Sequence, residues 1–346
     1  MLTLTEIVNI RTLLQSSQSP LFFFDNDPDG LASYLLLQRY RGKGKGVVIK
    51  SFPELNESYT RKLRELNPDY VFVLDKPLIA KGFIERTLQY GMKLIWIDHH
   101  PLPQDMNPDI YYFNPLKNKP YTNEPVSYWC YKISNKKQDD WIALLGCIGD
   151  WFLPDFYQEV ANKYRDLLAK NIKKASEVLY ETEFGRIAKI LSFALKDKTS
   201  NVVRMLKFLI KVETPYEILE ENNKTRTIYY RFRQINRKYE KLLEKAKKFA
   251  RRKLLFFQYG GNLSISGELA NELFHLYPDK VIAVAYIKGE EAKISFRGNI
   301  NIRSIVARMV KEFDGRGGGH EKACAATLPV SDLPKFKEKL EDLIRS

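Results

Sequence analysis

The chain has 346 residues, which is enough for two domains that each bury a core of their own. Although 44% of the residues are hydrophobic, no apolar run approaches the roughly 20 residues that span a bilayer. The first residues also lack the pattern of a secretory signal, so we expect a soluble, cytoplasmic protein with no membrane partner. The three cysteines are far apart, which argues against a disulfide scaffold or a cysteine-rich zinc site. The net charge of +14 suggests an anionic partner.

The first part of the chain alternates between strand and helix patterns. Short apolar runs at Leu21–Phe24, Val47–Ile49, Tyr70–Leu74 and Leu94–Ile97 predict strands, and Leu31–Tyr40 predicts a helix. Continuous apolar strands separated by helices indicate a parallel sheet that is covered on both faces. The predicted fold class is therefore α/β, in which ligands bind beyond the carboxyl ends of the strands.

The region from Trp141 to Lys253 is predicted to be helical, and it ends in a long amphipathic helix. Between Lys224 and Lys253 there are 13 Lys or Arg residues against only Glu240 and Glu244. A charge run is usually a solvated helix face, but a face of nearly one sign repels itself, and a phosphate backbone would relieve that repulsion. We therefore expect nucleic acid as the anionic partner of this segment.

The C-terminal part returns to a mixed pattern. Val281–Ile287 and Lys293–Phe296 predict strands, and Ile302–Phe313 predicts a helix that is followed by a glycine-rich loop. Three segments are expected: a catalytic core at 1–160, a helical segment with a basic linker helix at 161–253, and a smaller domain at 254–346.

Acidic residues follow three of the predicted strands directly. The candidates are Asp25, Asp27 and Asp29 after the first strand, Asp75 after the third, Asp98, His99 and His100 after the fourth, and Asp150 after a later apolar run. One such turn would more often be simple turn chemistry, but several carboxylates at one sheet edge cannot all stay ionised without cations. Oxygen-rich ligation suits Mn²⁺ or Mg²⁺, and two such ions about 3.5–4 Å apart form a recurring device for phosphoryl transfer.

The run Gly315-Arg316-Gly317-Gly318-Gly319-His320 is predicted to be a loop whose backbone N–H groups can approach a phosphate closely. Arg316 and His320 would add charge or donors there, and Arg297 is a second candidate for an anion contact.

The order of these motifs resembles that of a known family. Asp-x-Asp-x-Asp-Gly, a strand-terminal Asp, Asp-His-His and Gly-Asp resemble the four motifs of the DHH phosphoesterases, and Gly-Gly-Gly-His before Ala325-Ala326 resembles the DHHA1 domain. The resemblance covers residues 21–151 and about 255–345, and it implies a parallel-sheet DHH domain joined by a helical linker to a smaller α/β DHHA1-like domain.

The resemblance also implies roles for individual residues. The implied metal ligands are Asp25, Asp27, Asp29, Asp75, His99 and Asp150. The implied catalytic residues are Asp98, His99 and His100. The implied substrate-binding residues are Arg297, Arg316, Gly317, Gly318, Gly319 and His320.

Details of the first motif discriminate within the family. The oligoribonuclease and pAp phosphatase branch usually has His at the first motif position and Asp after the Gly, whereas this chain has Asp25 and Leu31. The pattern is more similar to the RecJ exonuclease branch, including its archaeal relatives. We therefore expect an exonuclease for single-stranded DNA or RNA that depends on two Mn²⁺ or Mg²⁺ ions.

Two alternatives stay open from the sequence. One is a hydrolase of very short oligonucleotides or of pAp, and the other is a scaffold in a replication complex, with replication proteins as partners. Lys76, which directly follows Asp75, also has more than one interpretation, because it either pairs with a carboxylate or phosphate or points to solvent.

Overall fold

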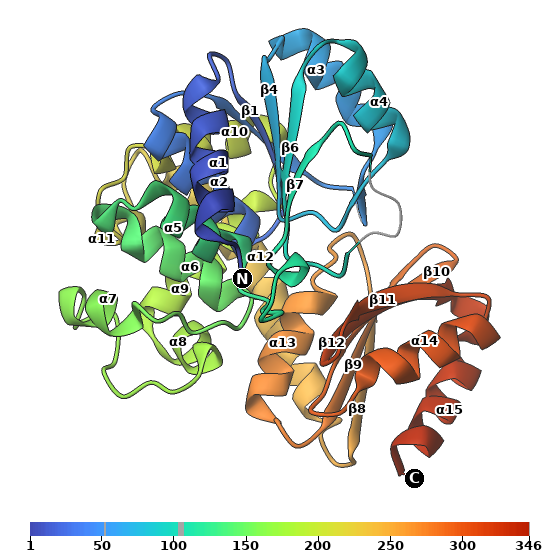
Figure 1. Cartoon of the computed structure of the whole chain (residues 1–346). Coiled ribbons are helices and arrows are strands. Elements are labelled where there is room, and N and C mark those ends of the chain that lie inside the picture. The colour runs from blue at the N-terminus through green and yellow to red at the C-terminus, as the bar shows by residue number, and fades with distance from the viewer. Residues whose placement is uncertain (52, 103–106, 346) are drawn as a thin grey trace. The chain divides into compact units, whose positions relative to one another are not determined.

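The computed structural model describes residues 1–51, 53–102 and 107–345. The chain folds as two compact units, Met1–Phe232 and Arg233–Ser346 (Figure 1). This division falls earlier in the chain than the predicted start of the last segment at residue 254, and the division into three segments stays a prediction. None of the helices in the described ranges is long and apolar enough to cross a bilayer.

The first unit is built on a five-stranded sheet with the strand order β2-β1-β4-β6-β7. Its strands are β1 (Leu21–Asp25), β2 (Lys45–Ile49), β4 (Tyr70–Leu74), β6 (Lys93–Ile97) and β7 (Tyr111–Phe113). Every neighbouring pair is parallel, which confirms the predicted parallel sheet. A separate pair of short parallel strands is formed by β3 (Glu54–Leu55) and β5 (Leu78–Ile79).

Successive side chains of a strand point to opposite faces of the sheet. Because both faces of this sheet are apolar, helices cover both of them. Phe23 packs with Phe83 and Leu63 on one face, whereas Phe22 and Phe24 pack toward the other. The first face is covered by α3 (Thr60–Leu66) and α4 (Lys81–Gln89). The second is covered by α1 (Leu4–Ser16), α2 (Pro28–Arg41), α5 (Val126–Ser134) and α6 (Asp140–Gly149).

The predicted helical region, residues 141–253, lies wholly within the described ranges and holds no strand. Its helices are the end of α6, then α7 (Tyr157–Lys163), α8 (Ala175–Glu181), α9 (Glu183–Leu195), α10 (Thr199–Leu209), α11 (Tyr216–Leu219) and α12 (Arg226–Lys247). Short 3₁₀ turns lie at Glu57–Tyr59, Pro115–Lys117, Lys137–Asp139 and Val330–Asp332.

The second unit has its own five-stranded sheet, with the order β11-β12-β10-β9-β8. Its strands are β8 (Leu254–Gly260), β9 (Val281–Lys288), β10 (Glu291–Arg297), β11 (Arg316–His320) and β12 (Ala323–Pro329), and only the β8–β9 pair is parallel. The core between Phe296, Met309 and Phe336 joins the sheet to α14 (Ile302–Glu312) and α15 (Leu333–Arg345). Helix α13 (Ser266–Leu276) packs against β9 and β10.

The predicted glycine-rich loop is wrong, because these residues form the edge strand β11, which pairs antiparallel with β12. The glycines allow a close approach of the two strands. A Cβ atom on Gly317 would lie 2.6 Å from the Ala325 carbonyl oxygen, and one on Gly319 would lie 2.4 Å from the Ala323 carbonyl oxygen. Gly319 also has a φ of +139°, which residues with a side chain rarely adopt. Glycine is therefore required at these positions by the sheet itself.

Candidate metal centre

The predicted acidic residues meet at the carboxyl edge of the parallel sheet. The register places Phe24 beside Leu74 and Leu74 beside Ile97, so the residues that come after these three strands lie at the same level. The backbone N–H of Asp75 donates to the Ile97 carbonyl over 3.0 Å, which keeps the chain in place just past the end of β4. Three strands therefore deliver side chains to one place, as expected for a sheet of this class.

Ligand atoms of Asp29, Asp75, His99 and Asp150 all lie within 4.8 Å of one another. His99 Nε2 is 3.1 Å from Asp150 Oδ2 and 3.5 Å from Asp75 Oδ1. Asp29, Asp75 and His99 are buried, whereas Asp150 is exposed, so the group is reached by solvent on one side. Three carboxylates and one imidazole form a donor set that suits Mn²⁺ or Mg²⁺.

The first turn of α2 positions two of the aspartates. Asp27 is the N-cap residue, and its Oδ1 accepts a hydrogen bond from the Gly30 N–H at 2.9 Å. Asp29 reaches further, because its two oxygens accept from the N–H groups of Val126 and Ser127, each at 2.8 Å. These are the first residues of α5, which receives no side-chain hydrogen bond from its own N-cap residue. Asp29 therefore caps α5 as well as facing the candidate metal centre.

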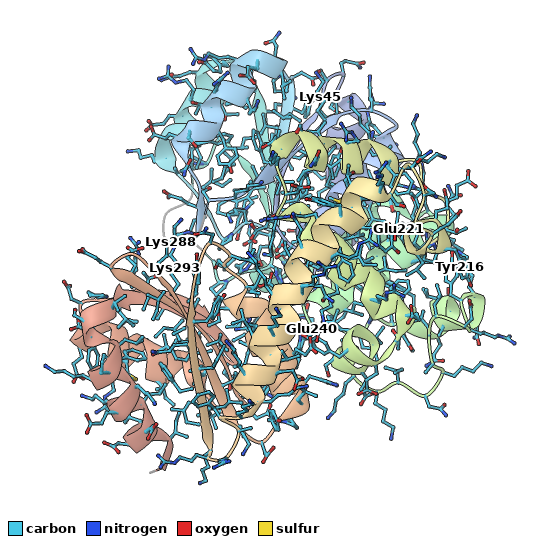
Figure 2. All side chains as sticks on the ribbon, turned by 180° about the vertical axis from the view of Figure 1, so that it is seen from behind. Lys45, Tyr216, Glu221, Glu240, Lys288 and Lys293 are labelled. Atoms are coloured by element: carbon cyan, nitrogen blue, oxygen red, sulfur yellow. The ribbon has the colours of Figure 1, made fainter. Side chains whose placement is uncertain are left out.

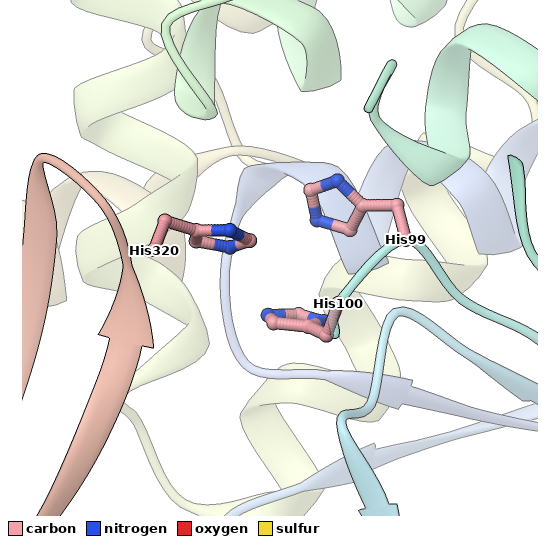
Figure 3. A group of neighbouring side chains, drawn as sticks. All are labelled: His99, His100 and His320. Atoms are coloured by element: carbon pink, nitrogen blue, oxygen red, sulfur yellow. The ribbon is translucent and has the colours of Figure 1, made fainter. Parts of the chain in front are cut away.

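A second group, formed by Asp75, Asp98 and His100, lies beside the first. His100 Nδ1 is 2.8 Å from Asp98 Oδ1, and the His100 N–H donates to Asp98 Oδ2 at 3.1 Å. The His100 carbonyl in turn accepts from Asn114 Nδ2 at 2.9 Å. Asp98 thus fixes the orientation of the His100 ring, and Asn114 holds the backbone of the same residue. The centroids of the His99 and His100 rings are 4.7 Å apart (Figure 3).

The electrostatics of the cluster favour a bound cation. Burial raises the pKa of Asp27 well above its ordinary value, and the charges of Asp25, Asp150 and Asp29 raise it further. Burial also raises the pKa of Asp75, together with its aspartate neighbours, and it raises the pKa of Asp29 to about 6. Crowded, buried carboxylates of this kind resist ionisation unless a cation neutralises them.

The pKa of His99 points in the same direction. Burial by itself lowers the pKa of His99, but its pairing with Asp150 and Asp75 raises it overall well above the ordinary value. The ring therefore attracts positive charge in the form of a proton when no ion is bound. A divalent ion would supply the positive charge that protons supply otherwise, so the residues present fit such an ion.

Two of the predicted ligands, Asp25 and Asp27, belong to neither of these groups of ligand atoms, and Asp25 has a cationic partner of its own. Its Oδ1 lies 2.9 Å from Nζ of Lys76, which is fully buried, and the same oxygen accepts from the Asn26 N–H at 2.8 Å. The sequence left the direction of Lys76 open, and the structure selects the carboxylate. The supporting role of Asn114 was missed, because nothing in its local sequence separates it from an ordinary turn residue.

The second unit holds the residues that the sequence predicted to bind substrate. Arg297 ends β10, and its guanidinium donates to Asn271 Oδ1 at 2.5 Å and to the Phe296 carbonyl at 2.7 Å. Arg316 is exposed at the start of β11 and lies 3.4 Å from Glu291 Oε1. His320 ends β11 and is labelled in Figure 3. Their role in binding substrate stays a prediction.

Helix α12 presents one apolar and one basic face. The buried stripe includes Ile235, Tyr239, Leu243 and Ala246. The exposed basic side chains on the helix and just beyond it are Arg226, Arg233, Arg237, Lys238, Lys241, Lys245 and Lys248. Figure 2 shows this helix along its length, with Glu240 labelled as one of its few acidic residues.

Comparisons with known proteins agree with this architecture. Residues 237–346 match the DHHA1 domain family. The fold is similar to RecJ of Thermus thermophilus in complex with Mn²⁺, at a TM-score of 0.70 and 15% identity, over 99% of this chain and 55% of that one. It is also similar to a DHH domain described as a member of the s1p family of ribosomal proteins, at a TM-score of 0.72 and 14% identity, over 98% of this chain and 90% of that one.

In sequence, the chain is 32% identical to an uncharacterized protein of Methanocaldococcus jannaschii over 75 residues, which is 20% of this chain and 17% of that protein. The chain thus spans only part of the length of that relative and about half of the Thermus RecJ chain. The similarities in structure extend over nearly the whole chain, and the DHHA1 match covers its C-terminal part. The C-terminal part of the chain therefore matches the DHHA1 domain family, and the fold of nearly the whole chain is similar to that of the RecJ and DHH-domain structures.

Proposed function

We propose that the protein is a phosphoesterase that depends on divalent metal ions and removes nucleotides from single-stranded DNA or RNA. The observation that carries the proposal is the convergence of ligand atoms from Asp29, Asp75, His99 and Asp150 within 4.8 Å at the carboxyl edge of the sheet. The Thermus RecJ to which the fold is similar was solved with Mn²⁺, which supports Mn²⁺ or Mg²⁺ as the cofactor here. We propose two ions, since Asp75 belongs to both ligand groups.

In this proposal some residues of the site bind the ions, and others orient the residues that bind them. When bound, the ions supply an activated water and neutralise charge that develops on the phosphate. Asp75 and Asp150 would hold the ions, and the carboxylate of Asp29 is kept in place by its two hydrogen bonds to the start of α5. Asp98 accepts a hydrogen bond from His100 Nδ1–H, which leaves Nε2 of that ring as an acceptor for an ion or a proton.

The proposal of a nucleic-acid substrate rests on the basic face of α12. Its exposed side chains, among them Arg237, Lys241 and Lys245, follow one another at spacings of four residues along the helix. Such a row can follow the phosphates of a single strand, and the affinity of such contacts depends on salt.

The test is hydrolysis of an end-labelled single strand, as DNA and as RNA, in Mn²⁺, in Mg²⁺ and in chelator. The control is the Asp98→Ala/His99→Ala double variant, which keeps the rest of the carboxylate cluster. We expect cleavage that requires metal and is lost in the control, and the product ladder gives its polarity.

Two other outcomes would redirect the proposal. Activity that falls sharply beyond a few nucleotides would favour a hydrolase of short oligonucleotides or of pAp. If polymers, dinucleotides and pAp all stay intact while Mn²⁺ binds, the protein would instead be a scaffold, with replication proteins as the partners to look for.

A further inference from the structure

Lys76 is the one lysine in the described residues that is fully buried, and it lies beside the candidate metal centre. Lysine is almost never fully buried unless it is paired, because taking an ammonium group out of water is costly. Its Nζ lies 2.9 Å from Asp25 Oδ1, in an ion pair that is nearly closed to solvent on the lysine side. The pair joins the ends of β1 and β4, which are neighbours in the sheet.

The backbone around Lys76 is held from several sides. Asp75 has a φ of +56°, in the left-handed region that few residues with a side chain adopt. The carbonyl of Lys76 accepts a hydrogen bond from Trp96 Nε1 at 2.8 Å. The sharp turn after β4 thus sends Asp75 into the ligand group and lets the next residue, Lys76, reach back to Asp25.

Asp25 is close enough to affect the cluster electrically. It ends β1, two residues before Asp27 and four residues before Asp29, which belongs to the group of ligand atoms. Yet the four ligand atoms that gather within 4.8 Å come from other residues, and Asp25 Oδ1 is already held by Lys76 and by the Asn26 N–H. An ammonium group at this place offsets one negative charge in a site that contains several.

We propose that Lys76 is a positioning residue that holds Asp25 in a permanent ion pair, so that Asp25 stays out of the metal ligand set and Lys76 sets how tightly the site binds divalent ions. The inference deepens the proposed function, since it concerns the same centre. It replaces the sequence-based expectation that Asp25 is itself a ligand.

The experiment measures Mn²⁺ binding by calorimetry and the stability of the metal-free protein in chelator. In Lys76→Met the Asp25 carboxylate loses its counter-charge, so Mn²⁺ should bind at least about tenfold more tightly. The attraction between one uncompensated carboxylate and a nearby divalent ion is large enough to change the affinity by more than this factor. The metal-free variant should melt at a lower temperature, since Asp25 is left uncompensated. Lys45→Met is the matched control, because Lys45 is exposed at the start of β2 and its loss changes the net charge equally (Figure 2).

The double variant Asp25→Asn/Lys76→Met keeps the experiment decisive even if the single variant does not fold. It removes both charges of the pair, so we expect Mn²⁺ affinity within about threefold of the wild type. A double variant that loses Mn²⁺ binding as completely as Asp75→Asn does would show that Asp25 is a ligand and would overturn the inference. An affinity of Lys76→Met that equals that of Lys45→Met would overturn it as well.

The Mn²⁺ affinity and the melting temperature of the metal-free protein are both independent of hydrolysis. A wild-type protein that binds Mn²⁺ but cleaves no phosphoester would refute the proposed function and leave the role of Lys76 to be judged on affinity alone. A wild-type protein that binds no Mn²⁺ would refute the role of Lys76 directly.

Discussion

The metal-free protein should lose stability as the pH rises from about 4 to 7. Asp29 has a folded pKa of about 6 against 3.8 for an exposed carboxyl group, so the folded state binds more protons than the unfolded state in this range. Stability is therefore highest below the unfolded pKa and declines as pH rises through the folded one. At about 1.4 kcal/mol per pKa unit, Asp29 alone accounts for about 3 kcal/mol. The raised pKa values of Asp27, Asp75 and His99 act in the same direction.

The assay is denaturant unfolding in chelator at several pH values, followed by tryptophan fluorescence. All four tryptophans, Trp96, Trp129, Trp141 and Trp151, lie in the first unit, so the signal reports on the unit that holds the cluster. Added Mn²⁺ should restore stability most strongly at pH 7. Asp75→Asn should flatten the pH dependence, since it removes one of the buried carboxylates. Metal-free protein that is as stable at pH 7 as at pH 5 would refute the reasoning.

Three further outcomes are expected. Asp98→Asn should lower Mn²⁺ affinity or hydrolysis by about 10- to 100-fold with little change in melting temperature, because the His100 ring loses the carboxylate that orients it. A loss of stability as large as the loss of binding would contradict this. Gly319→Ala should destabilise the second unit by about 1–3 kcal/mol in thermal unfolding, whereas Gly318→Ala, whose Cβ would meet nothing within 4 Å, should not. Lys241→Ala/Lys245→Ala should weaken single-strand binding for any sequence and reduce the salt slope by about 1.4, and an unchanged slope would remove α12 from the interface.

The strand-end aspartates could be predicted because apolar strands of a parallel sheet are visible in the sequence, and their carboxyl ends share one edge. The identity of the residue directly after each strand was then enough to place Asp75 and Asp98 near one another. The same reasoning did not decide the direction of the Lys76 side chain. The sequence shows that Lys76 comes just after a buried strand, but it does not show how the backbone turns there. That turn depends on the left-handed conformation of Asp75 and on the hydrogen bond from Trp96.

The strand β11 could not be predicted, because glycine has a low propensity for strands and three in a row are typical of a loop. The reason for these glycines lies in β12, whose carbonyl groups approach the positions where side chains would stand. The second role of Asp29 was hidden for a similar reason, since its partners Val126 and Ser127 are about a hundred residues away in the chain.

The capping of α5 by Asp29 has a practical consequence for trapping a bound substrate. A variant made at Asp29 would lose two hydrogen bonds to the start of a helix in the core of the unit, so a missing activity could reflect a loosened fold. Asp150 is exposed and ends α6, so its carboxylate can be exchanged for an amide with less disturbance of the interior. An inactive protein intended to be crystallised with an intact strand should therefore be sought at Asp150, which keeps the architecture around the strand as it is in the working molecule.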